Sequence, residues 1–199
     1  MADISENGKK ALKIIFTDFL ANYNSYSIKD GIGISGVGSL KLLRILKAKS
    51  ILLSEKMGNA IFYKPNLKNK YLLKLLELIF LDNSSLPSFA KGWIYDLREF
   101  IPLTKAILLF GSILRKGSNA RDVDVCFILK NHKDYPKLQN KVDEINKKNR
   151  LKIHPLYLTK RDFEEKLRKK DKPLIDMVKN CAVVHGEDLF VEVLKDVQS

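Results

Sequence analysis

The stretch that constrains the fold most is residues 108–129, where two apolar segments flank a Gly-Ser turn and a short basic loop. The second apolar segment opens with Asp122 and Asp124. Residues i and i+2 of a strand face the same side, so these two carboxylates must lie next to each other. Neighbouring carboxylates repel each other unless a cation lies between them. The stretch therefore predicts two neighbouring strands that present a pair of acidic groups.

The turn before the acidic pair is suited to phosphate. Gly111 has no side chain, so the backbone can come close to a ligand there. Ser112 offers a hydroxyl and an N–H at the expected start of a short helix, where anions bind readily. Mg²⁺ is usually held by one or two carboxylates together with substrate phosphates. The combination favours nucleotide chemistry.

The pattern Gly111-Ser112, nine residues, then Asp122-Val123-Asp124 resembles the signature of the DNA polymerase β-like nucleotidyltransferase superfamily, in particular its minimal members. The resemblance extends over residues 88–199. It implies that Gly111 and Ser112 bind the nucleoside triphosphate (NTP). It also implies that Asp122 and Asp124 are catalytic and hold two Mg²⁺ ions. The alternative is an ordinary turn followed by a solvated pair of aspartates.

The same resemblance implies a third carboxylate on a later strand, near residues 154–156. The sequence has His154, Pro155 and Leu156 there, and no acid stands on the expected strand over residues 151–158. In the family this carboxylate activates the attacking hydroxyl. His154 could act as the base instead, and the alternative is a packing or surface histidine. Whether the chain is an enzyme therefore stays open.

Basic residues favour an anionic partner. Arg115, Lys116 and Arg121 surround the Gly-Ser turn and are candidates for binding phosphates; a solvated basic loop is the alternative. The whole chain carries 36 Lys and Arg against 23 Asp and Glu, a formal charge of +13. Such an excess most often indicates nucleic acid, with a lysine-rich solvated surface as the alternative.

The N-terminal part predicts three helices and a hairpin. The helices are expected over residues 9–22, 27–32 and 37–49, and the hairpin over 51–63 around a Gly-Asn turn. This order resembles the winged helix–turn–helix of archaeal and bacterial regulators. The resemblance implies that the third helix enters the major groove of double-stranded DNA and that the hairpin touches the backbone. The implied DNA-binding residues are Ser39, Lys41, Arg44 and Lys47 on the helix, and Lys56 and Asn59 on the hairpin. A protein-contact module is the alternative.

Other signals exclude several classes of site. A formal Gly-x-Gly-x-x-Gly match at residues 31–36 follows a polar segment, whereas a dinucleotide site needs an apolar strand there. Cys126 and Cys181 belong to no Cys/His cluster, so no zinc site is predicted, and Cys126 is expected in the core. The longest apolar stretch, residues 71–81, is too short to span a bilayer. We therefore expect a cytoplasmic protein without a membrane partner.

These patterns predict an α+β fold. We expect a winged helix–turn–helix domain over residues 1–65, a connector helix and loop over 66–86, and a nucleotidyltransferase domain over 87–199. The transferase domain should contain a small mixed sheet with flanking helices. The connector helix is apolar nearly all round, so another surface must bury it, and we expect a homodimer.

Two functions follow from these expectations. The first is an enzyme that moves a nucleoside monophosphate from an NTP to a hydroxyl of protein, RNA or a small molecule, coupled to DNA binding. The second is a transcriptional regulator or antitoxin-like protein, with a toxin as partner, whose degenerate transferase domain only senses nucleotide. The acidic pair favours the first function. The missing third acid and the winged helix favour the second.

Overall fold

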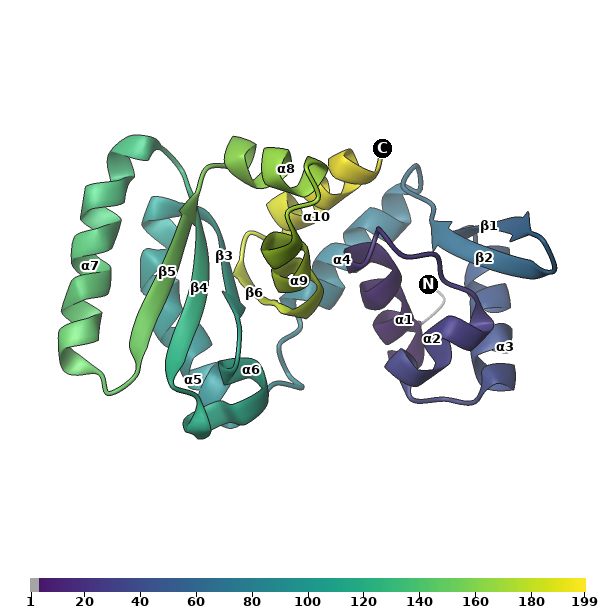
Figure 1. Cartoon of the computed structure of the whole chain (residues 1–199), viewed down its shortest axis with the longest axis horizontal. Coiled ribbons are helices and arrows are strands. Elements are labelled where there is room, and N and C mark those ends of the chain that lie inside the picture. The colour runs from purple at the N-terminus through teal and green to yellow at the C-terminus, as the bar shows by residue number, and fades with distance from the viewer. Residues whose placement is uncertain (1–3) are drawn as a thin grey trace. The chain divides into compact units, whose positions relative to one another are not determined.

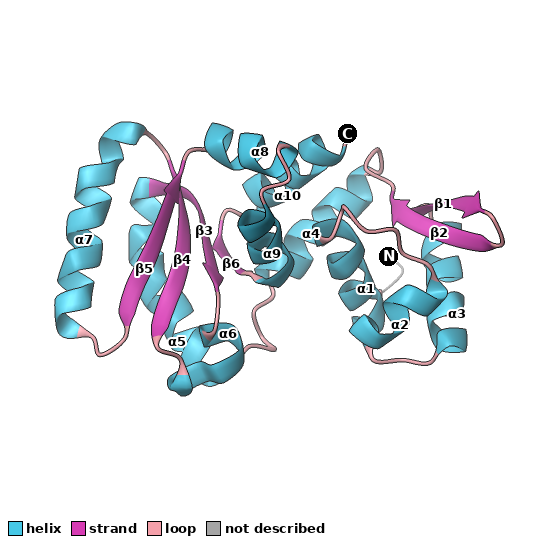
Figure 2. Ribbon diagram, in the orientation of Figure 1, coloured by secondary structure: helices cyan, strands magenta, loops and turns pink. Residues whose placement is uncertain are grey.

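The computed structural model describes residues 4–199, and the chain divides into two compact units. The first unit extends to Ile79 and includes Gln198 and Ser199, and the second runs from Phe80 to Val197. Both units contain helices and strands (Figure 2), so the predicted α+β class is confirmed. Among the described residues, no helix combines the length and apolarity needed to cross a membrane.

The first unit contains three helices followed by a two-stranded antiparallel hairpin (Figure 1). Its elements are α1 (Glu6–Thr17), α2 (Ser25–Ile32), α3 (Gly36–Ala48), β1 (Leu52–Met57), β2 (Ala60–Pro65) and most of α4 (Lys70–Leu81). The expected Gly-Asn turn joins β1 to β2, since Met57 pairs with Ala60. Asn69 caps α4 by accepting a hydrogen bond from the Tyr71 N–H at 2.9 Å.

The first helix lies earlier in the chain than the predicted 9–22. The Ser5 hydroxyl accepts a hydrogen bond from the Gly8 N–H at 3.3 Å, which caps the helix before Glu6. The helix ends at Thr17 because Asp18 leaves the helical region, with φ −96° and ψ 59°. The Asp18 carboxylate instead accepts a hydrogen bond from the Tyr23 hydroxyl at 2.8 Å. The Ser5 cap and the turn at Asp18 thus set the two ends of α1, which the spacing of apolar residues alone predicted wrongly.

A glycine-rich turn joins α2 to α3. Gly33 adopts φ +80°, a left-handed conformation that favours glycine, and its N–H donates to Lys29 O at 2.9 Å. The Ser39 hydroxyl donates to Ser25 O at 2.5 Å, which ties the two helices together. Ser39 is fully buried. The prediction that Ser39 faces DNA is therefore wrong, because its hydroxyl is used inside the helix pair.

The second unit is built around a mixed four-stranded sheet in the order β5-β4-β3-β6. The strands are β3 (Thr104–Phe110), β4 (Asp122–Leu129), β5 (Lys152–Leu158) and β6 (Ala182–His185). The helices are α5 (Ser88–Leu97), α6 (Ile113–Lys116), α7 (Tyr135–Lys148), α8 (Lys160–Arg168), α9 (Lys172–Asn180) and α10 (Glu187–Gln198). β3 is antiparallel to β4 and β6, whereas β4 and β5 are parallel. A parallel pair needs a crossover, and α7 supplies it.

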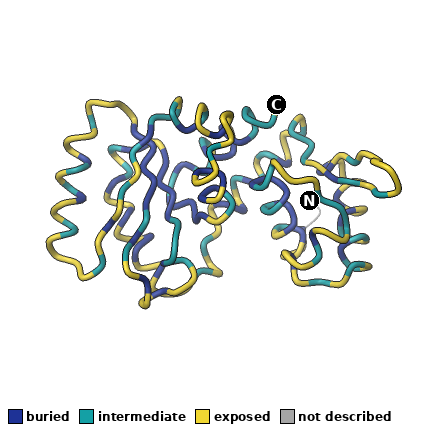
Figure 3. The backbone as a smooth tube through the Cα atoms, viewed as in Figure 1, coloured by how far each residue is buried: buried dark blue, intermediate teal, exposed yellow. Residues whose placement is uncertain are grey.

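Helices cover the sheet on both faces. On one face, Trp93 of α5 and Leu138 of α7 pack with Val125 and Phe127 of β4 in a single core. α8 contacts β4 and β5. Figure 3 shows β3 and β4 largely in the colour of buried residues, whereas most residues of the edge strand β5 are intermediate or exposed. Cys126 is fully buried, so the prediction that it belongs to the core is confirmed.

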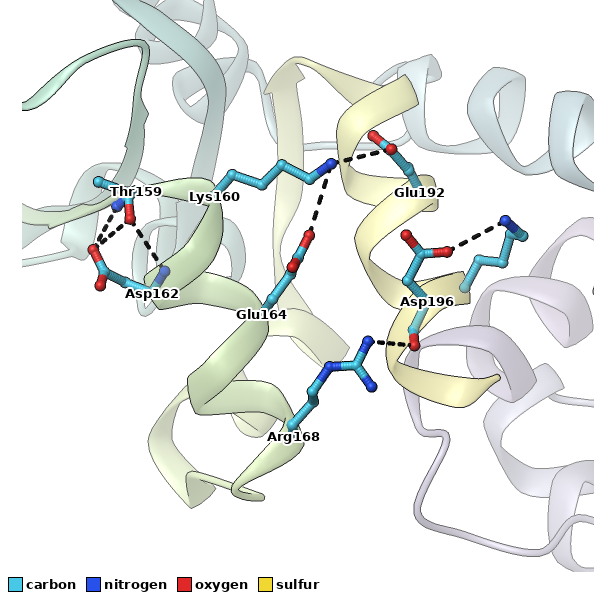
Figure 4. A network of polar contacts seen from close by, with 8 residues as sticks. Thr159, Lys160, Asp162, Glu164, Arg168, Glu192 and Asp196 are labelled. Atoms are coloured by element: carbon cyan, nitrogen blue, oxygen red, sulfur yellow. Dashed lines mark hydrogen bonds and ion pairs between the residues drawn. The ribbon is translucent and has the colours of Figure 1, made fainter.

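Polar contacts hold α8 and α10 together (Figure 4). Lys160 Nζ lies 3.0 Å from Glu192 Oε1 on α10, and this hydrogen bond raises the pKa of Lys160. Arg168 donates to the Asp196 carbonyl at 2.7 Å. Thr159 and Asp162 form a reciprocal cap at the start of α8. α8 follows the end of β5, so it begins at the end of the sheet opposite to Asp122.

Replacing Gly186 with alanine should destabilise the second unit. Gly186 has φ +79°, and an added Cβ would overlap Lys105 O and lie 2.6 Å from Ala106 Cβ. We expect a loss of about 1–3 kcal/mol in the free energy of unfolding, measured by chemical denaturation. The control is Gly92→Ala in α5, where an added Cβ meets nothing within 4 Å. An equal response of both variants would contradict the packing around Gly186.

Candidate active site

Asp122 and Asp124 stand at the start of β4, next to α6 at the end of β3 (Figure 1). Both are half-buried, while Val123 between them is fully buried in the core. Asp124 pairs with Phe110 of β3 and with His154 of β5. Because residues in register share a face of the sheet, Asp122, Asp124 and His154 all face the same side.

The three side chains form one cluster of metal-binding groups. One ligand atom from each of Asp122, Asp124 and His154 lies within 4.8 Å of the others. His154 Nδ1 is 3.4 Å from Asp122 Oδ2, slightly longer than a normal hydrogen bond. The His154 side chain is 63% exposed, so it is not a packing residue. The structure thus brings the predicted acidic pair together with the histidine that replaces the expected third acid.

The negative charges of Asp122 and Asp124 repel each other. Burial raises the pKa of Asp124, and the negative charge of Asp122 raises it further, while His154 lowers it. Neither aspartate has a lysine or arginine ion-pair partner within residues 4–199. A charged pair in this position is stabilised by any cation that binds between the carboxylates.

Gly111 is required by the acidic pair itself. It has φ +80°, and an added Cβ would overlap Asp124 Oδ2 and lie 2.9 Å from Asp124 Cγ. The following residue, Ser112, precedes α6, and its carbonyl accepts hydrogen bonds from the N–H groups of Arg115 and Lys116 at 3.0 and 2.8 Å. The Ser112 hydroxyl makes no cap hydrogen bond. The turn therefore places the Gly111 backbone directly against the Asp124 carboxylate.

Three basic residues lie along the chain between the turn and the acidic pair. Arg115 and Lys116 end α6, and Arg121 directly precedes Asp122. All three are exposed, and within the described chain none has a carboxylate partner within 4.0 Å. Lys141 and Lys160, by contrast, have ion-pair partners. The cations next to the site are therefore available for an anionic ligand.

The candidate DNA-binding residues lie in the first unit and form no part of this cluster. Lys41, Arg44 and Lys47 are exposed on α3, at a spacing that places them on one side of the helix. Lys56 and Asn59 are exposed at the hairpin tip. Of the predicted set, only Ser39 is buried.

Sequence reasoning missed two contacts of the site. One is the close approach of Gly111 to the Asp124 carboxylate, which a glycine directly after a strand could have signalled. The other is the position of His154 beside Asp122. The parallel register of β4 and β5 creates this second contact, and no local pattern reveals a register.

Asp124→Asn should stabilise the metal-free protein and remove its response to metal. The substitution ends the repulsion between the carboxylates, but the site is partly solvated, so we expect a gain below about 1 kcal/mol at pH 7 in EDTA. The raised pKa means that folding favours protonated Asp124. The free energy of unfolding of the wild type should therefore fall furthest below that of Asp124→Asn at neutral pH. The difference should disappear as the pH falls below the ordinary aspartate range.

The measurement is chemical denaturation of both proteins in EDTA and in millimolar Mn²⁺. Mn²⁺ should stabilise the wild type and leave Asp124→Asn unchanged, because a ligand stabilises only the state that binds it. Asp96→Asn, an exposed aspartate of α5, is the control and should behave as wild type. Equal stabilisation of all three proteins by Mn²⁺ would contradict a metal site at Asp124.

Comparison with known proteins supports the assignment of the second unit. Residues 94–185 match the family model described as a nucleotidyltransferase domain, a segment that runs from α5 through β6 and contains the whole sheet and the acidic cluster. Neither the curated proteins nor the solved structures gave a match to this chain. The predicted nucleotidyltransferase resemblance is thereby confirmed for residues 94–185, which are similar to that family.

Proposed function

We propose that the second unit transfers a nucleoside monophosphate from an NTP to a hydroxyl acceptor on protein, RNA or a small molecule. One observation carries the proposal. Adjacent carboxylates, Asp122 and Asp124, lie against the Gly111–Ser112 turn inside a segment that matches a nucleotidyltransferase domain. Nucleotide transfer needs a triphosphate held next to divalent metal, and this arrangement offers both kinds of group.

The residues present fit a divalent metal. Carboxylate oxygens and an imidazole nitrogen lie within 4.8 Å of one another, and the carboxylates have no lysine or arginine partner in the described chain. When bound, the metal ions (two, in this proposal) would stabilise charge on the attacking and leaving oxygens. Asp122 and Asp124 would hold them.

The chain's own residues would hold and neutralise the triphosphate. Gly111 brings the backbone of the turn against Asp124, and the Ser112 hydroxyl is not used to cap α6. Arg115, Lys116 and Arg121 are exposed cations, and each could offset part of the phosphate charge. Positioning and charge compensation account for most of the catalysis of phosphoryl and nucleotidyl transfer.

His154 stands on β5 where the resemblance implies a third carboxylate. β5 carries no acid, and His154 Nδ1 lies 3.4 Å from Asp122 Oδ2. In the second candidate function, which the absence of an acid on β5 favours, the unit binds nucleotide without transferring it and acts as a regulator or antitoxin-like protein.

Nucleotide transfer should depend on the acidic pair. We expect label from α-labelled NTP, with Mg²⁺ or Mn²⁺, to appear on the protein or on added total RNA. Asp122→Ala/Asp124→Ala should lower the rate by at least about 10²-fold, as loss of charge stabilisation does elsewhere. Asp96→Asn is the control.

Different outcomes separate the candidate functions. Metal-dependent NTP binding without transfer to any acceptor would favour the nucleotide-sensing function. NTP binding that survives the double substitution unchanged would contradict both functions at this site.

We further propose that the first unit is a winged helix–turn–helix that binds double-stranded DNA. Three helices precede a hairpin, and the turn between α2 and α3 is fixed by Gly33 and the Ser39–Ser25 hydrogen bond. Lys41, Arg44 and Lys47 line the outer side of α3, and no ion-pair partner of theirs occurs among the residues that the structure describes. Unpartnered cations on the second helix of such a motif are suited to the major groove.

Substituting Lys41 and Arg44 with alanine should weaken DNA binding, measured by fluorescence anisotropy on random-sequence duplex across a salt series. Two lost phosphate contacts should reduce the slope of log affinity against log salt by about two. Lys10→Ala, an exposed lysine of α1, is the control and should keep both slope and affinity. An unchanged slope in the double variant would exclude α3 as the DNA-binding helix.

A further inference from the structure

His154 occupies the place from which β5 can reach the acidic pair. It is in register with Asp124, and its Nδ1 lies 3.4 Å from Asp122 Oδ2. Its neighbours on the same face of β5 are Lys152 and Leu156, neither of which can act as a metal ligand at neutral pH. The imidazole is therefore the one group that β5 offers to a cation held by the aspartates.

Lys152 could have neutralised the acidic pair, but the structure uses it elsewhere. It pairs in register with Asp122, yet its ammonium donates to the carbonyls of Asn146 and Asn149, the latter at 2.7 Å. These carbonyls end α7, where the helix dipole favours a cation. The carboxylates are thus left with an imidazole, which carries a lone pair, instead of a permanent positive charge.

The distances fit three ligands of one cation. Ligands at about 2.0–2.2 Å from a metal lie about 3 Å apart when adjacent and about 4.4 Å apart when opposite. The separation of 3.4 Å between His154 Nδ1 and Asp122 Oδ2 is close to the adjacent case. The ligand atoms of the cluster are at most 4.8 Å apart. A small side-chain rotation would bring the most distant pair to the separation of opposite ligands.

We propose that His154 is a direct metal ligand and that the resulting mixed nitrogen and oxygen site prefers a transition-metal dication, with Mn²⁺ as its representative, over Mg²⁺. The inference rests on the proposed function, because it takes the aspartates as the other ligands. Imidazole binds transition metals well, whereas Mg²⁺ strongly prefers oxygen ligands and retains its waters. A carboxylate at position 154 would remove this preference.

A salt link between protonated His154 and Asp122 is the competing account. At 63% exposure such a link would contribute little to stability, and it would place no nitrogen on a metal. The two accounts therefore differ in a spectroscopic property as well as in affinity. They can be separated without measuring catalysis.

The experiment uses the full-length protein and Mn²⁺ alone. Electron spin-echo envelope modulation of bound Mn²⁺ should show coupling to a directly bound ¹⁴N nucleus. The coupling should disappear in His154→Asp and His154→Gln. In the same samples, Mg²⁺ competition should show the Mn²⁺-over-Mg²⁺ preference falling by at least about tenfold in His154→Asp, since even supporting groups of metal ligands contribute that much to affinity.

Matched controls distinguish the possible failures. His132→Ala removes another exposed histidine, which follows the far end of β4, and should keep the coupling and the preference. Mn²⁺ binding that gives no ¹⁴N coupling, with an unchanged preference in both His154 variants, would overturn the ligand role and leave the aspartate site intact. No Mn²⁺ binding by the wild type, or binding that survives Asp122→Ala/Asp124→Ala, would overturn the proposed function itself.

Discussion

The repulsion between Asp122 and Asp124 is the constraint on which the site depends. The pleat of β4 places both carboxylates on one face, and the register with β3 and β5 brings Phe110 and His154 to the same level. Gly111 completes the arrangement, because any side chain there would overlap the Asp124 carboxylate. The protein supplies no lysine or arginine to this pair within the described chain. The fold thus holds two like charges close together, and in the proposed function a bound cation compensates them.

The surroundings of the pair support the proposal that the bound ligand is a nucleoside triphosphate with divalent metal. Arg115, Lys116 and Arg121 carry unpaired positive charge along the chain between the turn and the carboxylates, which a bare metal site would not need. An anion bound together with cations explains both features, and a nucleoside triphosphate with divalent metal has that composition. The match of residues 94–185 to a nucleotidyltransferase domain agrees with this chemistry. The buried strands β3 and β4 hold Gly111 and the acidic pair in place.

Much of the fold could be predicted because local patterns determine it. Strand β4 begins at Asp122 as expected, and helix α3 and the hairpin of β1 and β2 lie close to their expected ranges. The predictions are wrong where a single hydrogen bond sets the end of a helix or the direction of a side chain. Ser5 and Asp18 set the ends of α1, and the Ser39 hydroxyl turns inward to Ser25. The position of His154 depends on the pairing of β4 with β5, whose strands are separated in sequence by α7, so local spacing could not reveal it.

The most direct test is a crystal structure with Mn²⁺ and a non-hydrolysable NTP analogue, using the anomalous signal of manganese. The account predicts manganese between Asp122 and Asp124, with the triphosphate against the Gly111–Ser112 turn and next to Arg115, Lys116 or Arg121. Manganese and nucleotide bound elsewhere on the protein, with Asp122 and Asp124 in contact only with solvent, would contradict it.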